Sequence, residues 1–307
     1  MAETRSVKSL LPLIGLGVGA GGVIFVVRTV VTRRGEVAEA LSGTATAPLV
    51  LSVLLGLCAM GLIGAVWTGM LRGRGHSAPA GTAMSWYFVG QLGKYVPGGI
   101  WPVVGRAEMA VRGGVPRPEA YGATGVSLLT TYAAAPLVAG VGGLLSGRHT
   151  AAGATALLAY VLLWADMNNA GFVSVITRMI AKVSGREVTM PDRSRFFRLV
   201  AMHSPAWLLM ALSTSVTASA LGAHIGVSEM VYVTSVSWLV GFLVPGVPGG
   251  IGVRESVFTA LAGPVMGTGP AVTLALVSRV VFIAVDVAGA VVSSVVAGTR
   301  RDPSAER

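Results

Sequence analysis

The chain has 307 residues, of which 53% are hydrophobic and only 12% are charged, and its mean hydropathy is +0.73. Soluble domains carry about 25% charged residues, so this composition excludes an ordinary soluble protein and indicates an integral membrane protein. Most Lys and Arg residues behind the net charge of +10 lie between apolar runs, which points to anionic lipid headgroups as partners and away from nucleic acid.

Six apolar runs are long enough to cross a hydrocarbon core of about 30 Å as helices. They lie at residues 10–31, 47–71, 119–145, 151–178, 197–221 and 269–297. Two further apolar regions, 80–113 and 227–263, are each interrupted by the sequence Pro-Gly-Gly. A helix loses backbone hydrogen bonds at such a break, and hydrocarbon cannot replace them. We therefore expect each break to lie within protein or to face water.

Basic loops indicate the topology. The loop 178–198 contains six Lys and Arg residues, and further Arg residues lie in the C-terminal tail. Because Lys and Arg favour the cytoplasmic side of a membrane, we expect both segments and both termini to be cytoplasmic. We expect the chain to lie in the plasma membrane. The two interrupted regions then become re-entrant hairpins that enter from opposite faces. Eight ordinary spans with kinks are the alternative.

The two interrupted regions also resemble each other. Sliding the sequence by 151 residues aligns 89–100 with 240–251, and most of the aligned positions are identical. Three full spans separate the two copies, so the halves 1–150 and 151–307 are expected to have opposite orientations within one polytopic all-α domain. Inverted repeats with broken helices are typical of secondary transporters, whose binding site lies at the interface of the repeats.

Cationic residues accompany both breaks. Lys94 precedes the first Pro-Gly-Gly, Arg106 follows it, and Arg254 follows the second. A helix that stops inside a membrane exposes unpaired N–H groups and a positive dipole end, which favour an anion, so we predict an anionic headgroup between the breaks. The predicted headgroup-binding residues are Lys94, Tyr95, Gly98, Gly99, Arg106, Gly249, Gly250, Arg254 and Arg279.

Acidic residues in the apolar segments are costly to bury, so each is expected to have a partner or a purpose. The predicted charge-pairing or gating residues are Glu108, Asp166, Glu255 and Asp286. We expect Arg279 to contact Glu255 or a substrate phosphate, and Asp286 to contact Lys94 or Arg254. The alternative is that these arginines and glutamates pair only structurally, or extend to the membrane interface.

The other polar and aromatic residues give no sign of a catalytic centre. The four His residues lack close metal-ligand spacing, and no P-loop, HExxH or GxSxG motif is present. We therefore expect no metal, no cofactor and no enzymatic activity. The alternative, a membrane-embedded transferase, would need Glu108, Asp166 or Glu255 as its catalytic base. Tyr87 and Trp238 flank the broken regions, where interfacial anchoring accounts for them and contact with lipid is the alternative.

Three stretches, 92–120, 247–258 and 278–292, resemble the membrane region of lysylphosphatidylglycerol synthase/flippase proteins, and the similarity covers most of the chain. The resemblance implies a multi-spanning module that moves a lipid with a polar headgroup between leaflets. By motif, Arg254 and Glu255 match the charged end of the second element, and Arg279 and Asp286 match the charged positions of the last helix. Gly105-Arg106-Ala107-Glu108 departs from the order in aminoacyl-lipid members, which argues against lysyl-phosphatidylglycerol as the cargo.

We therefore expect a flippase or scramblase for an anionic lipid, either a phospholipid or a polyprenyl-phosphate-linked glycolipid. Because no synthase domain accompanies these motifs, any catalysis is expected to belong to a partner. The alternative is a non-transporting subunit that scaffolds a glycosyl- or aminoacyl-transferase. Expected partners are membrane lipids with anionic headgroups, together with either such a transferase or further copies of the chain.

Overall fold

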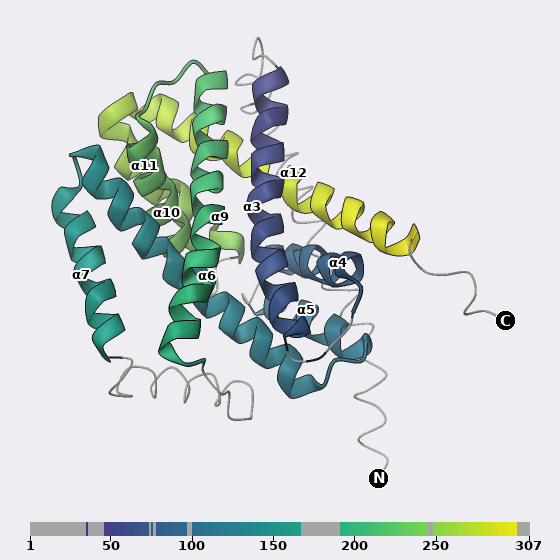
Figure 1. Ribbon diagram of the computed structural model, residues 1–307. Coiled ribbons are helices and arrows are strands. Elements are labelled where there is room, and N and C mark those ends of the chain that lie inside the picture. The colour runs from purple at the N-terminus through teal and green to yellow at the C-terminus, as the bar shows by residue number, and fades with distance from the viewer. Residues whose placement is uncertain are drawn as a thin grey trace.

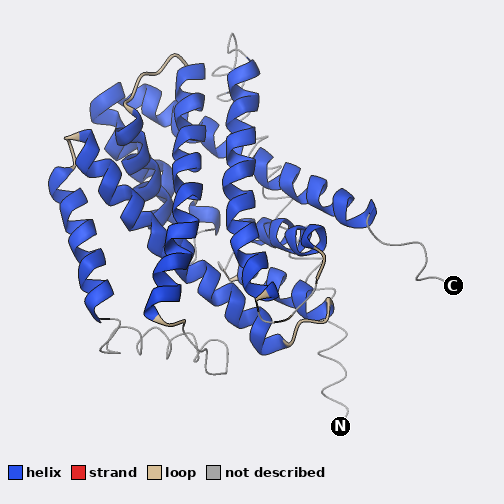
Figure 2. Cartoon of the chain, viewed as in Figure 1, coloured by secondary structure: helices blue, strands red, loops and turns tan. Residues whose placement is uncertain are grey.

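The computed structural model of the chain describes residues 35, 46–73, 75, 78–96, 100–166, 191–244 and 248–299. Within these residues all regular structure is helical and no strand occurs (Figure 2). In this described part of the chain four helices are long and apolar enough to cross a membrane: α3 (Thr46–Arg72), α6 (Arg117–Ser146), α9 (Arg193–Ala220) and α12 (Thr268–Thr299), all visible in Figure 1. The prediction of an all-α membrane protein is confirmed at this level.

These four helices coincide with the spans predicted at 47–71, 119–145, 197–221 and 269–297, with small shifts at their ends. A further helix, α7 (Thr150–Asp166), covers the first part of the span predicted at 151–178. The remainder of that span, and the whole of the span predicted at 10–31, lie outside the described residues.

Both interrupted regions contain two helices separated by a break. The elements are α4 (Ala80–Gln91), η1 (Leu92–Tyr95) and α5 (Trp101–Arg112) in the first region, and α10 (Val227–Leu243), η2 (Pro248–Gly250) and α11 (Val253–Met266) in the second. In the second break Gly249, Gly250 and Gly252 have φ values of 55°, 68° and 80°. Side chains with a Cβ rarely adopt this left-handed conformation, so the glycines allow the chain to leave one helix and begin the next. The first Pro-Gly-Gly, including Gly98 and Gly99, lies outside the described residues.

The order of helices repeats at the offset found in the sequence. A shift of 151 residues carries α6 onto residues 268–297, and α12 occupies Thr268–Thr299. The same shift places α3 on α9, α4 on α10 and α5 on α11, with ends that differ by a few residues. The similarity of 89–100 to 240–251 is thus part of a correspondence that extends over four consecutive helices.

The helix contacts have the pattern of two copies related by a two-fold axis. Helix α4 packs on α12 as α10 packs on α6, α5 packs on α6 as α11 packs on α12, and α3 meets its own counterpart α9. In Figure 1, α4 and α5 lie on one side of the α3–α9 pair and α10 and α11 on the other. Each of these contacts of one half therefore has its reciprocal in the other half, as in an isologous dimer.

The central pair of helices runs antiparallel. The hydroxyls of Ser213 and Thr217, near the end of α9, donate to the backbone oxygen and the side-chain oxygen of Ser52, near the start of α3, at 2.8 and 3.1 Å. A two-fold axis that relates two antiparallel helices is perpendicular to them. An inverted repeat needs this arrangement, so the contacts support the predicted halves 1–150 and 151–307, which stay a prediction.

Close packing between α4 and α12 depends on small residues. A Cβ on Gly289 of α12 would lie 2.2 Å from the Phe88 ring of α4, which is buried and leaves no space for it. Gly298, on the same helix, has no atom within 4 Å of the position that its Cβ would take. The two glycines therefore form a matched pair, one in the α4–α12 contact and one outside it.

We expect Gly289→Ala to destabilise the protein by about 1–3 kcal/mol, because overpacking forces the Phe88 ring out of its rotamer or separates the helices. The thermal unfolding midpoint of the detergent-purified protein measures this effect. Gly298→Ala should leave the midpoint unchanged or raise it, and Phe88→Leu combined with Gly289→Ala should recover part of the loss. Equal midpoints for Gly289→Ala and Gly298→Ala would contradict the described α4–α12 packing.

Candidate functional site

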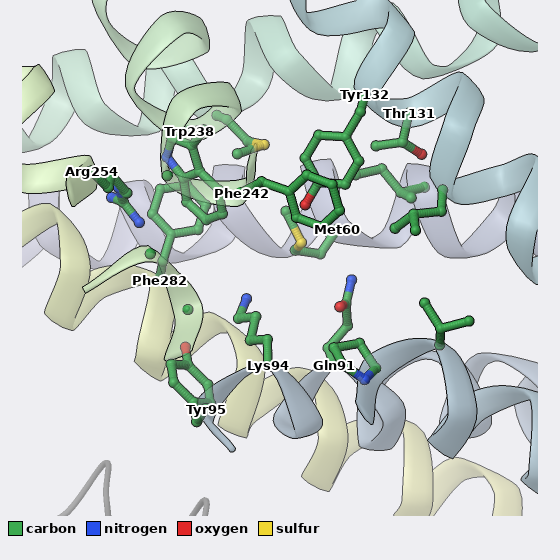
Figure 3. Close-up of a pocket in the computed structure, with 18 of the residues that line it drawn as sticks. Met60, Gln91, Lys94, Tyr95, Thr131, Tyr132, Trp238, Phe242, Arg254 and Phe282 are labelled. Atoms are coloured by element: carbon green, nitrogen blue, oxygen red, sulfur yellow. The ribbon is translucent and has the colours of Figure 1, made fainter. Parts of the chain in front are cut away.

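A cavity of about 320 Å³ lies between the two broken regions and is also lined by residues of α3, α6, α9 and α12 (Figure 3). Of the nine residues predicted to bind a headgroup, all seven that the structure describes line this cavity. These are Lys94, Tyr95, Arg106, Gly249, Gly250, Arg254 and Arg279. The structure thus brings together cationic residues from both halves of the sequence, while their role in binding stays a prediction.

One cation of the cavity belongs to a buried network with a carboxylate. Lys94 Nζ lies 2.6 Å from Asp286 Oδ2, and the Tyr95 hydroxyl donates to the same oxygen at 2.5 Å. Asp286 is 0% exposed, so its charge depends on these two partners for stabilisation. The expected contact of Asp286 with Lys94 is confirmed. It joins η1 to α12, and Figure 3 shows Lys94 and Tyr95 extending from η1.

A second ion pair holds the other break against the last helix. Arg279 Nη1 lies 2.5 Å from Glu255 Oε1, and Arg279 Nη2 lies 3.5 Å from the carbonyl oxygen of Gly249. The other carboxylate oxygen of Glu255 accepts a hydrogen bond from the Gly252 N–H at 2.6 Å, at the start of α11. The expected contact of Arg279 with Glu255 is confirmed, and both groups also bind backbone atoms that the break leaves unpaired.

Two further arginines of the cavity contact aromatic rings. The guanidinium carbon of Arg254 lies 4.0 Å from the Trp238 ring centroid, and that of Arg106 lies 5.4 Å from the Tyr87 ring centroid. Only 7% of Arg254 and 4% of Arg106 is exposed. Among the residues that the structure describes, neither arginine is within ion-pair distance of a carboxylate. Since burial of an unpaired charge is costly, this arrangement is unusual for a purely structural residue.

These two arginines pack against corresponding positions of the two halves. Tyr87 and Gly90 become Trp238 and Gly241 after the shift of 151 residues, and each glycine faces the arginine of its own half. A Cβ on Gly90 would lie 2.8 Å from Arg106 Cβ, and one on Gly241 would lie 3.0 Å from Arg254 Cβ. The glycines therefore allow each arginine helix to approach the preceding helix closely.

The aromatic partners of the arginines were not predicted from the sequence. Tyr87 was expected to anchor the chain at the membrane interface, but it is completely buried, and both Tyr87 and Trp238 line the cavity. The prediction of interfacial anchoring is therefore wrong for Tyr87. Glycine three residues after each aromatic residue, in both halves, is the sequence signal that could have identified the pairs.

The two halves differ in their ion pairs. The positions that correspond to Arg279 and Asp286 of α12 are Leu128 and Ala135 of α6, which carry no charge. Both ion pairs at the cavity therefore involve α12, and the corresponding positions of α6 cannot form them.

Two of the predicted acidic residues lie elsewhere. Glu108 accepts hydrogen bonds from Arg117 at 2.6 Å and from the Tyr121 hydroxyl at 2.6 Å, a contact that joins α5 to α6, and it does not line the cavity. Asp166 is the last residue of α7, and its side chain lies outside the description. In the part of the chain that the structure describes, no three His, Cys, Asp or Glu side chains come together as a metal site.

Comparison with known proteins identifies the relationship. A model of the family described as the lysylphosphatidylglycerol synthase transmembrane region matches residues 13–289. This range includes both broken regions and all residues of the cavity. A comparison with curated proteins found no match.

The Lys94–Asp286 contact can be tested by stability measurements. Asp286→Asn should destabilise the protein by about 3–5 kcal/mol, because it leaves the partly buried ammonium group of Lys94 without a counter-charge. Glu108→Gln is the matched control, since it removes a carboxylate from a more exposed pair that contributes about 0–1 kcal/mol. The double variant Lys94→Met with Asp286→Asn should recover part of the loss. If Asp286→Asn and Glu108→Gln shift the thermal midpoint equally, the buried network does not have the role described.

Proposed function

Because the chain belongs to the lysylphosphatidylglycerol synthase transmembrane-region family, we propose that it is a flippase or scramblase that moves an anionic lipid between leaflets. The observation that carries this proposal is the cavity between the two broken regions, to which both halves contribute cations. A phosphate group is the natural ligand of such a site, since guanidinium groups bind phosphate oxygens through paired N–H donors. The cargo is either a phospholipid or a polyprenyl-phosphate-linked glycolipid.

The rim of the cavity supports a path for the lipid chains. Phe242 and Leu243, at the end of α10, line the cavity and yet are 41% and 62% exposed. Large exposed apolar side chains of a membrane protein face lipid at no cost. In the proposed mechanism the headgroup enters the cavity beside these residues, while the acyl or prenyl chains stay in the bilayer.

The internal two-fold relationship supports alternating exposure of the headgroup. We propose that the two broken regions are re-entrant hairpins that enter from opposite faces, so that each leaflet reaches the cavity past one of them. One half would then rock against the other, as in transporters built from inverted repeats. With this orientation, the proposal also has both termini in the cytoplasm and the chain in the plasma membrane.

A non-transporting scaffold for a glycosyl- or aminoacyl-transferase is the second candidate. The exposed apolar faces of α7 and α12 favour this scaffold, because a membrane helix of a transferase could pack on them in place of lipid. In neither proposal does the chain itself catalyse a reaction. Co-purification of a transferase, together with no lipid movement by the isolated chain, would favour the scaffold.

Transport is tested with the purified full chain in proteoliposomes that contain fluorescent phosphatidylglycerol, whose movement is followed by quenching from outside. Arg254→Gln should slow headgroup movement about tenfold or more, because a charge-assisted contact with phosphate is lost. Arg117→Gln is the control, since Arg117 lies outside the cavity and its side chain is 56% exposed. Arg254→Lys keeps the charge and should move the headgroup at an intermediate rate. This variant therefore separates loss of phosphate binding from loss of folding.

The assay also has outcomes that contradict the proposal. An unchanged rate for a folded Arg254→Gln variant would remove this residue from the mechanism. No lipid movement by the wild-type chain, under conditions in which it remains folded, would overturn the flippase proposal itself.

A further inference from the structure

The cavity contains more positive than negative charge. Four cationic side chains line it, namely Lys94, Arg106, Arg254 and Arg279. In the described part of the chain only two carboxylates contact them, Asp286 on Lys94 and Glu255 on Arg279. Among the described residues this leaves two positive charges without a counter-charge, and they are those of Arg106 and Arg254.

These two arginines also have donors to spare. An aromatic ring stabilises the face of a guanidinium group, but it does not occupy the N–H groups at the edge. Among the residues that the structure describes, Arg106 Nε is buried without a hydrogen-bond partner, and Arg254 has a single long hydrogen bond, 3.3 Å from Nη2 to the Ser278 hydroxyl. Because both arginines line the cavity and their guanidinium groups are not fully hydrogen-bonded, they could donate to an anion bound there.

The two free arginines belong to different halves of the repeat. Arg106 follows the first break and Arg254 follows the second, and each is held against the preceding helix of its own broken region. A single monoanionic group could neutralise one of them and would leave the other buried and unpaired. A ligand whose two anionic groups reach both arginines across the cavity could neutralise both at once.

We propose that the cavity binds a lipid diphosphate, with one phosphoryl group on Arg106 and the other on Arg254. This inference rests on the proposed function and names the class of cargo more narrowly than an anionic lipid. Lys94 and Arg279 retain their carboxylate partners and hold the breaks in position around the diphosphate. The prenyl or acyl chain leaves the cavity past Phe242 and Leu243.

Binding to the detergent-purified full chain tests the proposal. The probes are farnesyl diphosphate, farnesyl phosphate and dioctanoylphosphatidylglycerol, with inorganic pyrophosphate as the probe for a free anion. Farnesyl diphosphate should bind about tenfold or more tightly than farnesyl phosphate, because it gains a second charge-assisted contact. Pyrophosphate that binds as tightly as farnesyl diphosphate would show that the site takes a soluble anion, and would overturn the assignment to a lipid.

Variants assign the two phosphoryl groups. Arg106→Gln and Arg254→Gln should each bring the ratio of farnesyl diphosphate to farnesyl phosphate affinity close to one, while Arg117→Gln should leave it unchanged. If Arg106→Gln does not fold, Arg106→Lys keeps the charge but loses the paired N–H donors, and should reduce the ratio partly. A ratio that responds to only one of the two arginines would overturn the two-site arrangement, as would two bound farnesyl phosphates per chain in native mass spectrometry.

The two proposals fail in different ways. Movement of phosphatidylglycerol without any preference for diphosphates in binding would overturn the diphosphate assignment and leave the flippase proposal intact. Preferential binding of farnesyl diphosphate by a chain that moves no lipid would have the opposite effect.

Discussion

The structure around the cavity depends on one constraint: an apolar environment offers no hydrogen-bond partners to the backbone groups that a helix break leaves unpaired. Where α10 ends and α11 begins, backbone groups lose their helical partners, and side chains replace them: Glu255 accepts from the Gly252 N–H, and Arg279 reaches the Gly249 carbonyl. Each of these side chains is charged, so each requires the other as a counter-charge. The break and the ion pair are therefore parts of one structural unit.

This dependence separates the cations of the cavity into two kinds. Lys94 and Arg279 are paired with carboxylates and join the breaks to α12, so their presence is explained by the fold. Arg106 and Arg254 contact aromatic rings instead, and nothing in the described packing requires a positive charge at either position. Buried charge that the fold does not need is the better indicator of a ligand.

Much of the architecture could be predicted from apolar length and from helix breakers, because both act locally. The Arg279–Glu255 pair was also predictable, since a buried cation needs a nearby carboxylate. The equivalence of Arg106 and Arg254 was hidden, because Arg106 is the sixth residue of α5 while Arg254 is the second of α11, about one turn earlier. Alignment at the constant offset of 151 therefore misses it, and only the packing of Gly90 and Gly241 shows it. Glu108 was predicted to be a charge-pairing or gating residue; it does pair with a cation, Arg117, but on the side of α5 that meets α6 and outside the cavity.

The uneven distribution of ion pairs between the halves has an energetic consequence. In a molecule whose two halves were chemically identical, opening toward one leaflet and opening toward the other would be isoenergetic by symmetry. Here Leu128 and Ala135 stand where the last helix has Arg279 and Asp286. Each broken region is thus tethered by an ion pair to α12, while the corresponding positions of α6 carry no charge, so the two halves are not chemically equivalent around the cavity. For a flippase of the kind proposed, inward-open and outward-open conformers would therefore differ in energy even before any cargo is bound.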